Sequence, residues 1–462
     1  MIPLTLAEVA SATGGRLDAV ADPAVRVTGP VVTDTRELGP GGLFVARQGE
    51  ARDGHDFAAA AVEAGAVAVL AERPVGVPAV VVDDTEVAFG RLARAVLDRL
   101  PQVTVVGVTG SSGKTTTKDL LAQVLEPLGP LVAPPGSYNG EIGVPLTVLR
   151  VDESTRTLIA EMGARGAGHI AYLCGIAPPS VGIVLNVGSA HLGEFGDRDT
   201  IARAKAELVE ALPETGTAVL NADDPVVRRM AEQTPAQVVM VGESVHADVR
   251  AEDVALDAAG RASFRLVTAD ADARVSLRLV GEHQVSNALA VAGAALALGL
   301  PLDDVAARLS AALPRSRWRM EVTERPDGVT VVNDAYNANP ESMRAALKTL
   351  VSLGRPAAGR TWAVLGEMRE LGESSIAEHD AIGRLAVRLN VSRLVAVGDG
   401  ARAIHQGATL EGSWDGESAW APDVDAAFDL LRAELRPGDV VLVKSSRDAG
   451  LRFLGERLVE DK

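Results

Sequence analysis

Residues 103–118 have the sequence Val103-Thr-Val-Val-Gly-Val-Thr-Gly-Ser-Ser-Gly-Lys-Thr-Thr-Thr-Lys118. The first part is apolar and β-branched, which favours a strand, and the second part places Gly110 and Gly113 before Lys114 and Thr115. Glycines leave backbone N–H groups unshielded, so they hold phosphate well, while the lysine reaches terminal phosphates and the threonine hydroxyl a Mg²⁺ ion. The stretch therefore predicts a strand, a phosphate-binding loop and a helix.

The spacing Gly-x-x-Gly-Lys-Thr has two residues fewer between its glycines than the general phosphate-loop pattern. The groups that contact phosphate are all present, so we expect the same chemistry; the alternative is an ordinary glycine turn that starts a helix. The predicted nucleotide-binding residues of this loop are Gly110, Ser111, Ser112, Gly113, Lys114, Thr115 and Thr116.

Length and composition set limits on the fold and the partners. A chain of 462 residues suggests about three domains, and 47% hydrophobic residues with only 3% aromatic ones indicate an α/β protein. The net charge of −17 argues against nucleic acid as a partner, because such binding depends on lysine and arginine. The single cysteine, Cys174, excludes an intramolecular disulfide and suits a reducing compartment.

No segment of the sequence predicts export or membrane insertion. The N-terminus lacks a basic stretch followed by an apolar one, so we expect no signal peptide and a cytoplasmic location. The most apolar predicted helix, Ala288 to Leu302, is interrupted by Gly293 and Gly299 and is shorter than the ~20 residues that cross a bilayer. We expect it to be a core helix.

The pattern along the chain predicts three α/β domains. Residues 1–83 alternate short strands (26–32, 42–46, 67–70, 79–82) with helices (6–13, 55–64). Residues 84–313 contain continuously apolar strands at 156–160, 181–187 and 218–221, typical of a mostly parallel sheet buried on both faces, with antiparallel strands expected within 246–280. Residues 314–462 form a second, smaller Rossmann-like domain with strands at 329–333, 361–365, 393–397 and 440–444.

Polar residues follow the central strands where open parallel sheets bind their ligands. Glu161 ends one strand, and His191 lies just beyond the next, so the two could share a metal with nucleotide phosphates; the alternative is a capping glutamate and a surface histidine. Lys205 lies on a predicted helix, where the pattern alone indicates a solvated lysine. In the third domain, residues 332–342 are rich in Asn and Asp, which fits either a ligand loop or a capped turn.

Together these motifs closely resemble the Mur ligases, the ATP-dependent amide ligases of peptidoglycan precursor synthesis, through all three domains. The resemblance implies that residues 109–116 bind ATP, that Glu161 and His191 hold magnesium, with two Mg²⁺ ions expected, and that Lys205 is carbamylated. It makes Lys114, Lys205, His191 and Arg319 the expected catalytic residues. It also implies that ATP is bound by Asn287, Arg319, Asp334, Tyr336 and Asn337.

Within the family, the motifs are most similar to the branch that adds D-alanyl-D-alanine to UDP-N-acetylmuramoyl-tripeptide. The similarity is carried by residues 33–36, 41–46 and 53–57, by 138–147, and by 334–340 with 365–372, and no Asp-Asn-Pro-Arg of the diaminopimelate- or lysine-adding branch occurs. It implies that the substrates contact Thr35, Arg36, Asn139, Lys444, Ser446 and Arg447. Thr35, Gly140, Glu367 and Ser445 depart from the usual family residues.

The implied enzyme is a monomer that uses ATP to form an acyl phosphate, which the dipeptide amine then attacks. Two other ligases remain as alternatives: a different Mur-type ligase, or one like folylpolyglutamate synthetase, which the uridine-like N-terminal domain argues against. The alternative of another class is a non-catalytic nucleotide-binding switch, which would keep the loop 110–115 but would need neither Lys205 nor the Asn-rich stretch.

Overall fold

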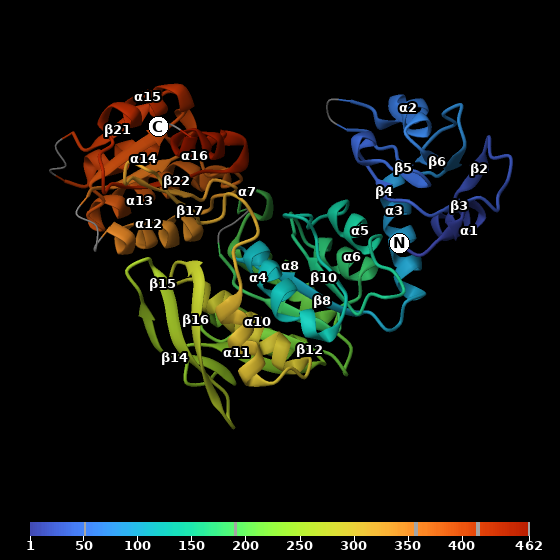
Figure 1. Ribbon diagram of the computed structural model, residues 1–462, viewed down its shortest axis with the longest axis horizontal. Helices are drawn as coiled ribbons and strands as arrows, with labels where there is room; N and C mark the ends of the chain where they lie inside the picture. The colour runs from blue at the N-terminus through green and yellow to red at the C-terminus, as the bar shows by residue number, and fades with distance from the viewer. Residues whose placement is uncertain (50–51, 189–191, 355–358, 413–415, 461–462) are drawn as a thin grey trace.

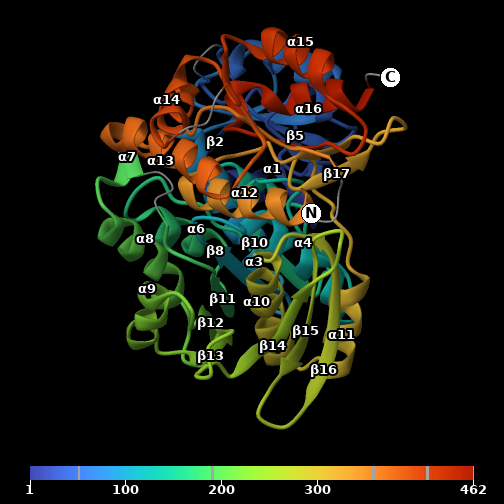
Figure 2. The same ribbon diagram turned by 90° about the vertical axis from the view of Figure 1, so that its left-hand side faces the viewer.

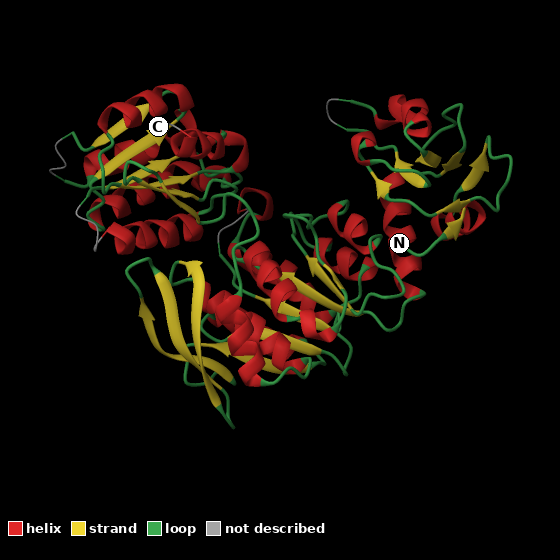
Figure 3. Ribbon diagram, viewed as in Figure 1, coloured by secondary structure: helices red, strands yellow, loops and turns green. Residues whose placement is uncertain are grey.

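Three large sheets, each from a different part of the chain, organise the molecule (Figure 1). The computed structural model describes residues 1–49, 52–188, 192–354, 359–412 and 416–460. The expected α/β class with mostly parallel sheets is confirmed, and Figure 3 shows helices on both faces of the C-terminal sheet. None of the helices in these ranges is both long and apolar enough to cross a membrane.

The N-terminal sheet has the strand order β2-β7-β6-β5-β4, and its strands pair in parallel except at β2. A separate antiparallel pair joins β1 and β3. The elements are β1 Leu4–Thr5, α1 Leu6–Thr13, β2 Arg16–Asp18, β3 Arg26–Val27, β4 Val31–Val32, β5 Gly42–Val45, α2 Ala58–Glu63, β6 Ala66–Ala71 and β7 Ala79–Val81.

The central sheet has nine strands in the order β16-β15-β14-β13-β12-β11-β8-β10-β9. The strands from β9 to β14 in this order, which include β8, pair in parallel with their neighbours. The last three strands, β14, β15 and β16, pair antiparallel as predicted. The strands are β8 Thr104–Thr109, β9 Leu131–Val132, β10 Thr157–Glu161, β11 Val181–Val184, β12 Thr217–Asn221, β13 Gln237–Gly242, β14 Val249–Leu256, β15 Arg261–Val267 and β16 Asp272–Val280.

Helices cover both faces of this sheet, and one joins it to the N-terminal sheet. The joining helix is α3 Thr85–Asp98, which packs against α1 on one side and against α5 and α6 on the other. The helices are α4 Lys114–Val124, α5 Gly143–Val148, α6 His169–Ile176, α7 Leu192–Phe195, α8 Arg198–Glu210, α9 Pro225–Arg229, α10 Gln284–Ala297 and α11 Leu302–Ala311. Buried residues of the N-terminal part and of the central part form one hydrophobic cluster. We propose that the boundary between these two domains lies between residues 83 and 84.

The C-terminal sheet has the order β17-β18-β22-β19-β20-β21, parallel except for β17 at one edge. Its elements are β17 Glu321–Glu324, β18 Thr330–Asn333, α12 Pro340–Gly354, β19 Thr361–Leu365, α13 Ser375–Arg388, β20 Arg393–Val397, α14 Arg402–Leu410, β21 Ser418–Ala421, α15 Val424–Glu434, β22 Val440–Lys444 and α16 Leu451–Glu460. Figure 2 shows this domain above the central one, and we propose that it begins near residue 314.

Several predicted element bounds were wrong, each for a local reason. The expected strand 26–32 is two short strands, because Pro30 has no N–H for a ladder and lies between β3 and β4. The expected helix 55–64 starts as a 3-10 turn, Gly54–Phe57, before α2. The expected helix 288–302 begins earlier, at Gln284, and stops before Gly299, whose φ of 88° breaks it from α11. The strand expected at 181–187 ends at Val184.

Candidate active site

The phosphate loop joins β8 to α4 as the sequence predicts. The last residue before the helix is Gly113, with a φ of 84°. A Cβ atom there would lie 2.4 Å from Oδ1 of Asn287, so both the backbone conformation and the approach of α10 require glycine. The loop ends at the N-terminus of an eleven-residue helix, where exposed N–H groups and the helix dipole favour an anion.

The carbonyl groups of the loop are held by side chains. Nζ of Lys114 donates to the carbonyl of Gly110 at 2.6 Å, and Nδ2 of Asn186 donates to the carbonyl of Ser112 at 3.3 Å. Burial lowers the pKa of Lys114, and Arg319 lowers it further, while the charge of Glu161 acts in the opposite direction. Burial therefore disfavours the ammonium form of Lys114, and a phosphate anion bound at the loop would stabilise that charge.

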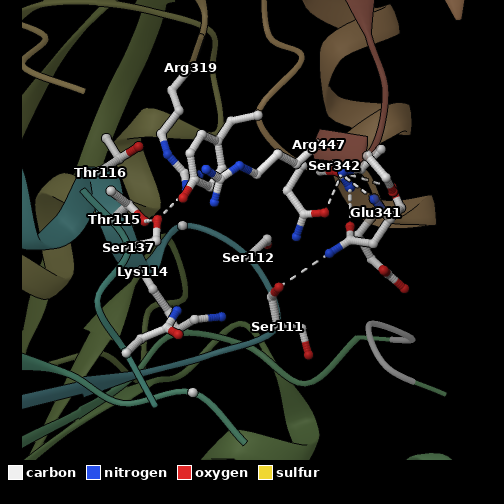
Figure 4. Close-up of a pocket in the computed structure, with 18 of the residues that line it drawn as sticks. Ser111, Ser112, Lys114, Thr115, Thr116, Ser137, Arg319, Glu341, Ser342 and Arg447 are labelled. Atoms are coloured by element: carbon white, nitrogen blue, oxygen red, sulfur yellow. Dashed lines mark hydrogen bonds between the residues drawn. The ribbon is translucent and has the colours of Figure 1, made fainter. Parts of the chain in front are cut away.

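An arginine of the C-terminal part faces the loop across a cleft (Figure 4). Nη2 of Arg319 donates to the hydroxyl of Ser137 at 2.7 Å, and that hydroxyl lies 2.9 Å from the hydroxyl of Thr115. The guanidinium also lies 4.3 Å from the centre of the Tyr336 ring, which fixes its plane by a cation–π contact. Two cations, Lys114 and Arg319, thus approach the cleft from different domains.

Glu161 forms an acidic wall of the cleft at the end of β10. Its Oε1 accepts a hydrogen bond from Nδ2 of Asn139 at 2.8 Å. Its Oε2 is buried and has no hydrogen-bond partner within the described residues. A buried carboxylate oxygen without a donor carries a large desolvation cost, which a cation would offset.

Lys205 is buried on α8, with 3% of its surface exposed, so the solvated lysine that the helix pattern predicted is wrong. Its neighbours on the same helix, Ala204 and Ala206, are buried as well. Burial, and then the nearby charge of Lys114, lower the pKa of Lys205 to about 7. A large part of this lysine is therefore a neutral amine near neutral pH.

The C-terminal side of the cleft contains a buried ion pair. Nζ of Lys444 lies 2.6 Å from Oδ2 of Asp334 and also donates to the carbonyl of Asn337 at 3.0 Å. The other oxygen of Asp334 accepts from the N–H of Met320 at 3.0 Å. These bonds fix the start of the Asn-rich stretch that follows β18, so it is an ordered wall of the site and not only a capped turn.

The cleft between the central and C-terminal domains has a volume of about 570 Å³. Predicted site residues that line it are Ser111, Ser112, Gly113, Lys114, Thr115, Thr116, Asn139, Glu161, Asn287, Arg319, Asp334, Tyr336, Asn337, Lys444, Ser446 and Arg447. Gly110 lies directly behind the loop, where its carbonyl holds Lys114. Thr35, Arg36 and Lys205 do not line the cleft, and His191 lies outside the described residues.

Three residues that contact the loop or its hydroxyl groups were not predicted as site residues, namely Ser137, Asn186 and Asn339. Ser137 bridges Arg319 and Thr115, and Asn339 donates from Nδ2 to the carbonyl of Ser111 at 3.2 Å. Asn339 stands directly before Pro340 in the Asn-rich stretch, and this position could have indicated it as a candidate site residue. Ser137 follows a Pro-Pro-Gly turn and carried no signal of its own.

A phosphate loop on one domain, faced by an arginine of a second α/β domain across a polar cleft, defines an enzyme that transfers or uses phosphoryl groups. Family models match three parts of the chain: "Mur ligase family, catalytic domain" at residues 30–105, "Mur ligase middle domain" at 108–295 and "Mur ligase, glutamate ligase domain" at 318–447. The chain belongs to the Mur ligase family, whose members are ATP-dependent ligases.

Relatives and solved structures match the chain over its length. A protein of Mycobacterium tuberculosis (strain H37Rv) named UDP-N-acetylmuramoyl-tripeptide--D-alanyl-D-alanine ligase is 54% identical, covering 100% of this chain and 98% of the relative. One of the same name from Escherichia coli K12 is 34% identical over 100% and 99%. The crystal structure of MurF from Acinetobacter baumannii has a TM-score of 0.90 at 33% identity, covering 99% of both chains. That of MurF from Thermotoga maritima in complex with ADP has a TM-score of 0.82 at 32% identity, covering 94% of this chain and 98% of that one.

Proposed function

We propose that this protein is an ATP-dependent amide ligase that joins D-alanyl-D-alanine to UDP-N-acetylmuramoyl-tripeptide in peptidoglycan precursor synthesis. The observation that carries the proposal is the approach of Lys114 and Arg319 to one cleft from two domains, in a chain whose full-length relatives are named for this reaction. We also propose that it acts in the cytoplasm as a monomer, since residues of one chain line both sides of the cleft.

The reaction has two steps. The terminal carboxylate of the tripeptide attacks the γ-phosphorus of ATP, which forms an acyl phosphate and releases ADP. The amine of D-alanyl-D-alanine then attacks the acyl carbon, the C–N bond forms, and phosphate leaves with the electrons of the C–O bond while the amine loses a proton. The first step turns a poor leaving group into a good one, and the charges of Lys114 and Arg319 stabilise the phosphoryl group as it moves.

Magnesium fits the donor set on the central domain. The unpartnered Oε2 of Glu161 and the hydroxyl of Thr115 are oxygen ligands of the kind that Mg²⁺ prefers. No cluster of three His, Cys, Asp or Glu side chains suited to a metal is found within the described ranges, so nucleotide oxygens and waters would complete the coordination. When bound, the ion neutralises phosphate charge, and we propose two ions, with His191 and carbamylated Lys205 assigned to the second.

The remaining cleft residues are proposed to hold the nucleotide and the dipeptide. We assign Gly110 to Thr116 to the phosphates, Asn287 to the adenine, and Asp334 with Tyr336 and Asn337 to the ribose side. Lys444, Ser446 and Arg447 are proposed to bind the incoming dipeptide, whose carboxylate needs a cation, and Arg447 supplies one within the cleft. Asn139 lines the cleft and donates a hydrogen bond to Glu161, and we propose that it contacts the tripeptide near its terminal carboxylate.

Thr35 and Arg36 are proposed to bind the uridine diphosphate end of the substrate. They lie in a 3-10 turn, Thr35–Glu37, on the N-terminal domain and outside the ATP cleft. Nε of Arg36 donates to Asp34 at 2.9 Å, and this contact holds the pKa of Asp34 at about 2. The long substrate would therefore span from the N-terminal domain to the cleft.

The test is incubation with ATP, Mg²⁺, UDP-N-acetylmuramoyl-tripeptide and D-alanyl-D-alanine, with the products identified by mass spectrometry. We expect one amide product and one phosphate for each ADP, with phosphate release that requires the dipeptide. Nucleotide binding without amine-dependent phosphate release would indicate a switch. Ligation of glutamate to a folate would instead indicate an enzyme like folylpolyglutamate synthetase.

A further inference from the structure

Asn339 is a residue of the C-terminal domain that contacts the phosphate loop of the central domain. It is buried, with 6% of its surface exposed, and directly precedes α12. Its Nδ2 donates to the carbonyl of Ser111 at 3.2 Å, and its Oδ1 accepts from the N–H of Ser342 at 2.8 Å. Both ends of the amide therefore have a defined partner, one in each domain.

The N–H, the hydroxyl and the carbonyl of Ser111 each form a hydrogen bond. Its N–H donates to the carbonyl of Asn186 at 3.1 Å, and its hydroxyl accepts from the N–H of Gly188 at 2.9 Å. These two contacts come from the central domain itself. The bond from Asn339 to the Ser111 carbonyl is the contact that comes from the other domain.

The peptide unit between Ser111 and Ser112 is consequently clamped at both ends by side-chain amides. The N–H of Ser112 donates to Oδ1 of Asn186 at 2.9 Å, while the carbonyl of Ser111 accepts from Asn339. The orientation of this unit determines how the chain enters Gly113 and the phosphate-binding N-terminus of α4. If the C-terminal domain moved away, the Ser111 carbonyl would exchange the Asn339 donor for water, and only the contact of Asn186 with the Ser112 N–H would still hold the peptide unit.

We propose that Asn339 is a positioning residue that couples docking of the C-terminal domain to the geometry of the phosphate loop. This proposal rests on the proposed function, in which the phosphate loop binds ATP. Since linkage is reciprocal, nucleotide binding then favours docking by the same factor by which docking raises nucleotide affinity. Figure 4 shows the start of α12, marked by Glu341 and Ser342, beside Ser111.

The variants separate this cross-domain bond from the helix cap. Asn339→Ser keeps a hydroxyl that caps α12 but cannot reach the Ser111 carbonyl, whereas Asn339→Ala loses both contacts. The control is Asp423→Ala, which removes the cap of α15 on the same domain, where Asp423 accepts from the N–H of Ala426 at 2.8 Å, away from the cleft.

The measurements use the full-length protein with Mg²⁺ and ADP. We expect ADP to decrease the radius of gyration of the wild type, measured by small-angle X-ray scattering, and an unchanged wild-type radius would contradict the coupling. Asn339→Ser should bind ADP about tenfold more weakly and should not show this decrease. Asp423→Ala should lower the thermal unfolding midpoint while ADP affinity and compaction stay as in the wild type. Asn339→Ala should show both effects.

A folded Asn339→Ser protein with wild-type ADP affinity and wild-type compaction would overturn the coupling. So would an Asp423→Ala protein that loses ADP affinity to the same extent, because a general loss of stability would then suffice. Neither measurement needs the peptide substrates, so a wild-type protein that fails to ligate would contradict the proposed function alone.

Discussion

Lys205 shows how burial changes the chemistry of a single side chain. An ordinary exposed lysine is an ammonium at neutral pH and does not react with carbon dioxide, which requires the free amine. The burial of Lys205 on α8 and the charge of Lys114 lower its pKa to about 7, so the amine is available. A carbamate there would also replace a second cation near Lys114 with an anion that attracts magnesium.

We predict that Lys205 is carbamylated and that the modified fraction falls as the pH falls. Below a pKa of about 7 the lysine is increasingly an ammonium, so the carbamate signal in ¹³C NMR with labelled bicarbonate should decrease from about pH 8 to about pH 6. Lys205→Ala should lose the signal and nearly all ligation, and acetate or formate should restore part of the rate.

Lys205→Arg is the matched control, because it keeps a cation that cannot be carbamylated and fills the site. It should be inactive and should not respond to acetate or formate. A Lys205→Arg protein with the wild-type rate would mean that positive charge suffices, and the carbamate would then have no role.

Lys114→Ala should abolish ligation while the protein stays folded. The change removes the cation that the loop holds against the Gly110 carbonyl, and losing one such phosphoryl clamp usually lowers kcat by about 10² or more. The exposed Lys348→Ala is the control and should keep its activity. Folded Lys114→Ala with more than about a tenth of the wild-type kcat would contradict the assignment of the loop.

At the scale of elements, local sequence predicts a strand or helix well where the pattern is continuous. β8 and α4 follow directly from the β-branched run and the glycines of residues 103–118. The split of residues 26–32 was missed although Pro30 marks it, and the start of α10 at Gln284 was missed because a buried polar residue begins that helix. The first case is a local effect of Pro30, and the second depends on the packing that buries Gln284.

The site was predicted in its parts but not in its contacts. The loop and Glu161 were identified as separate motifs and Arg319 from the resemblance to the Mur ligases, and the structure brings them to one cleft. The bridge through Ser137 joins residues far apart in the chain, and a spacing rule cannot reveal such contacts. The burial of Lys205 likewise depends on how α8 packs, since its helix pattern resembles that of an exposed helix.

The contact between α7 and the C-terminal domain should affect the use of ATP, because it joins the two domains that line the cleft. The N–H of Gly193 donates to the carbonyl of Glu370 at 2.9 Å, and a Cβ at Gly193 would lie 2.7 Å from the backbone N of Gly372 (Figure 2 shows α7 beside this domain). Gly193→Ala should push the two elements apart and lower kcat/KM for ATP by about fivefold or more.

Gly175→Ala is the control for that change. Gly175 lies on α6, and a Cβ there meets no other atom within 4 Å, so the variant should keep full activity. Equal activity of Gly193→Ala and the wild type would mean that the contact between α7 and the C-terminal domain has no role in ATP use.

At the scale of the whole molecule, we propose that the substrates are divided among the domains. The ATP cleft lies between the central and C-terminal domains, while the N-terminal domain lies on the far side of the central one in Figure 1. Lys114 and Arg319 belong to different domains, so the phosphoryl site is complete only when these two domains are docked. Docking also excludes water, which would otherwise hydrolyse the acyl phosphate.

The N-terminal domain should therefore affect one substrate alone, and Arg36 tests this. Arg36→Ala removes an exposed cation and leaves the carboxylate of Asp34 without its partner, so a diphosphate would bind less well. We expect the KM for the UDP-substrate to rise by roughly 10- to 100-fold, the usual effect of losing a charged hydrogen bond, with the KM values for ATP and D-alanyl-D-alanine nearly unchanged. Arg16→Ala, which removes another exposed arginine of the N-terminal domain, should change none of them. A rise in all three KM values for Arg36→Ala would show instead that Arg36 supports the fold. A residue that only binds the UDP-substrate on this domain does not contact the ATP cleft, so it should not change the KM values of the other two substrates.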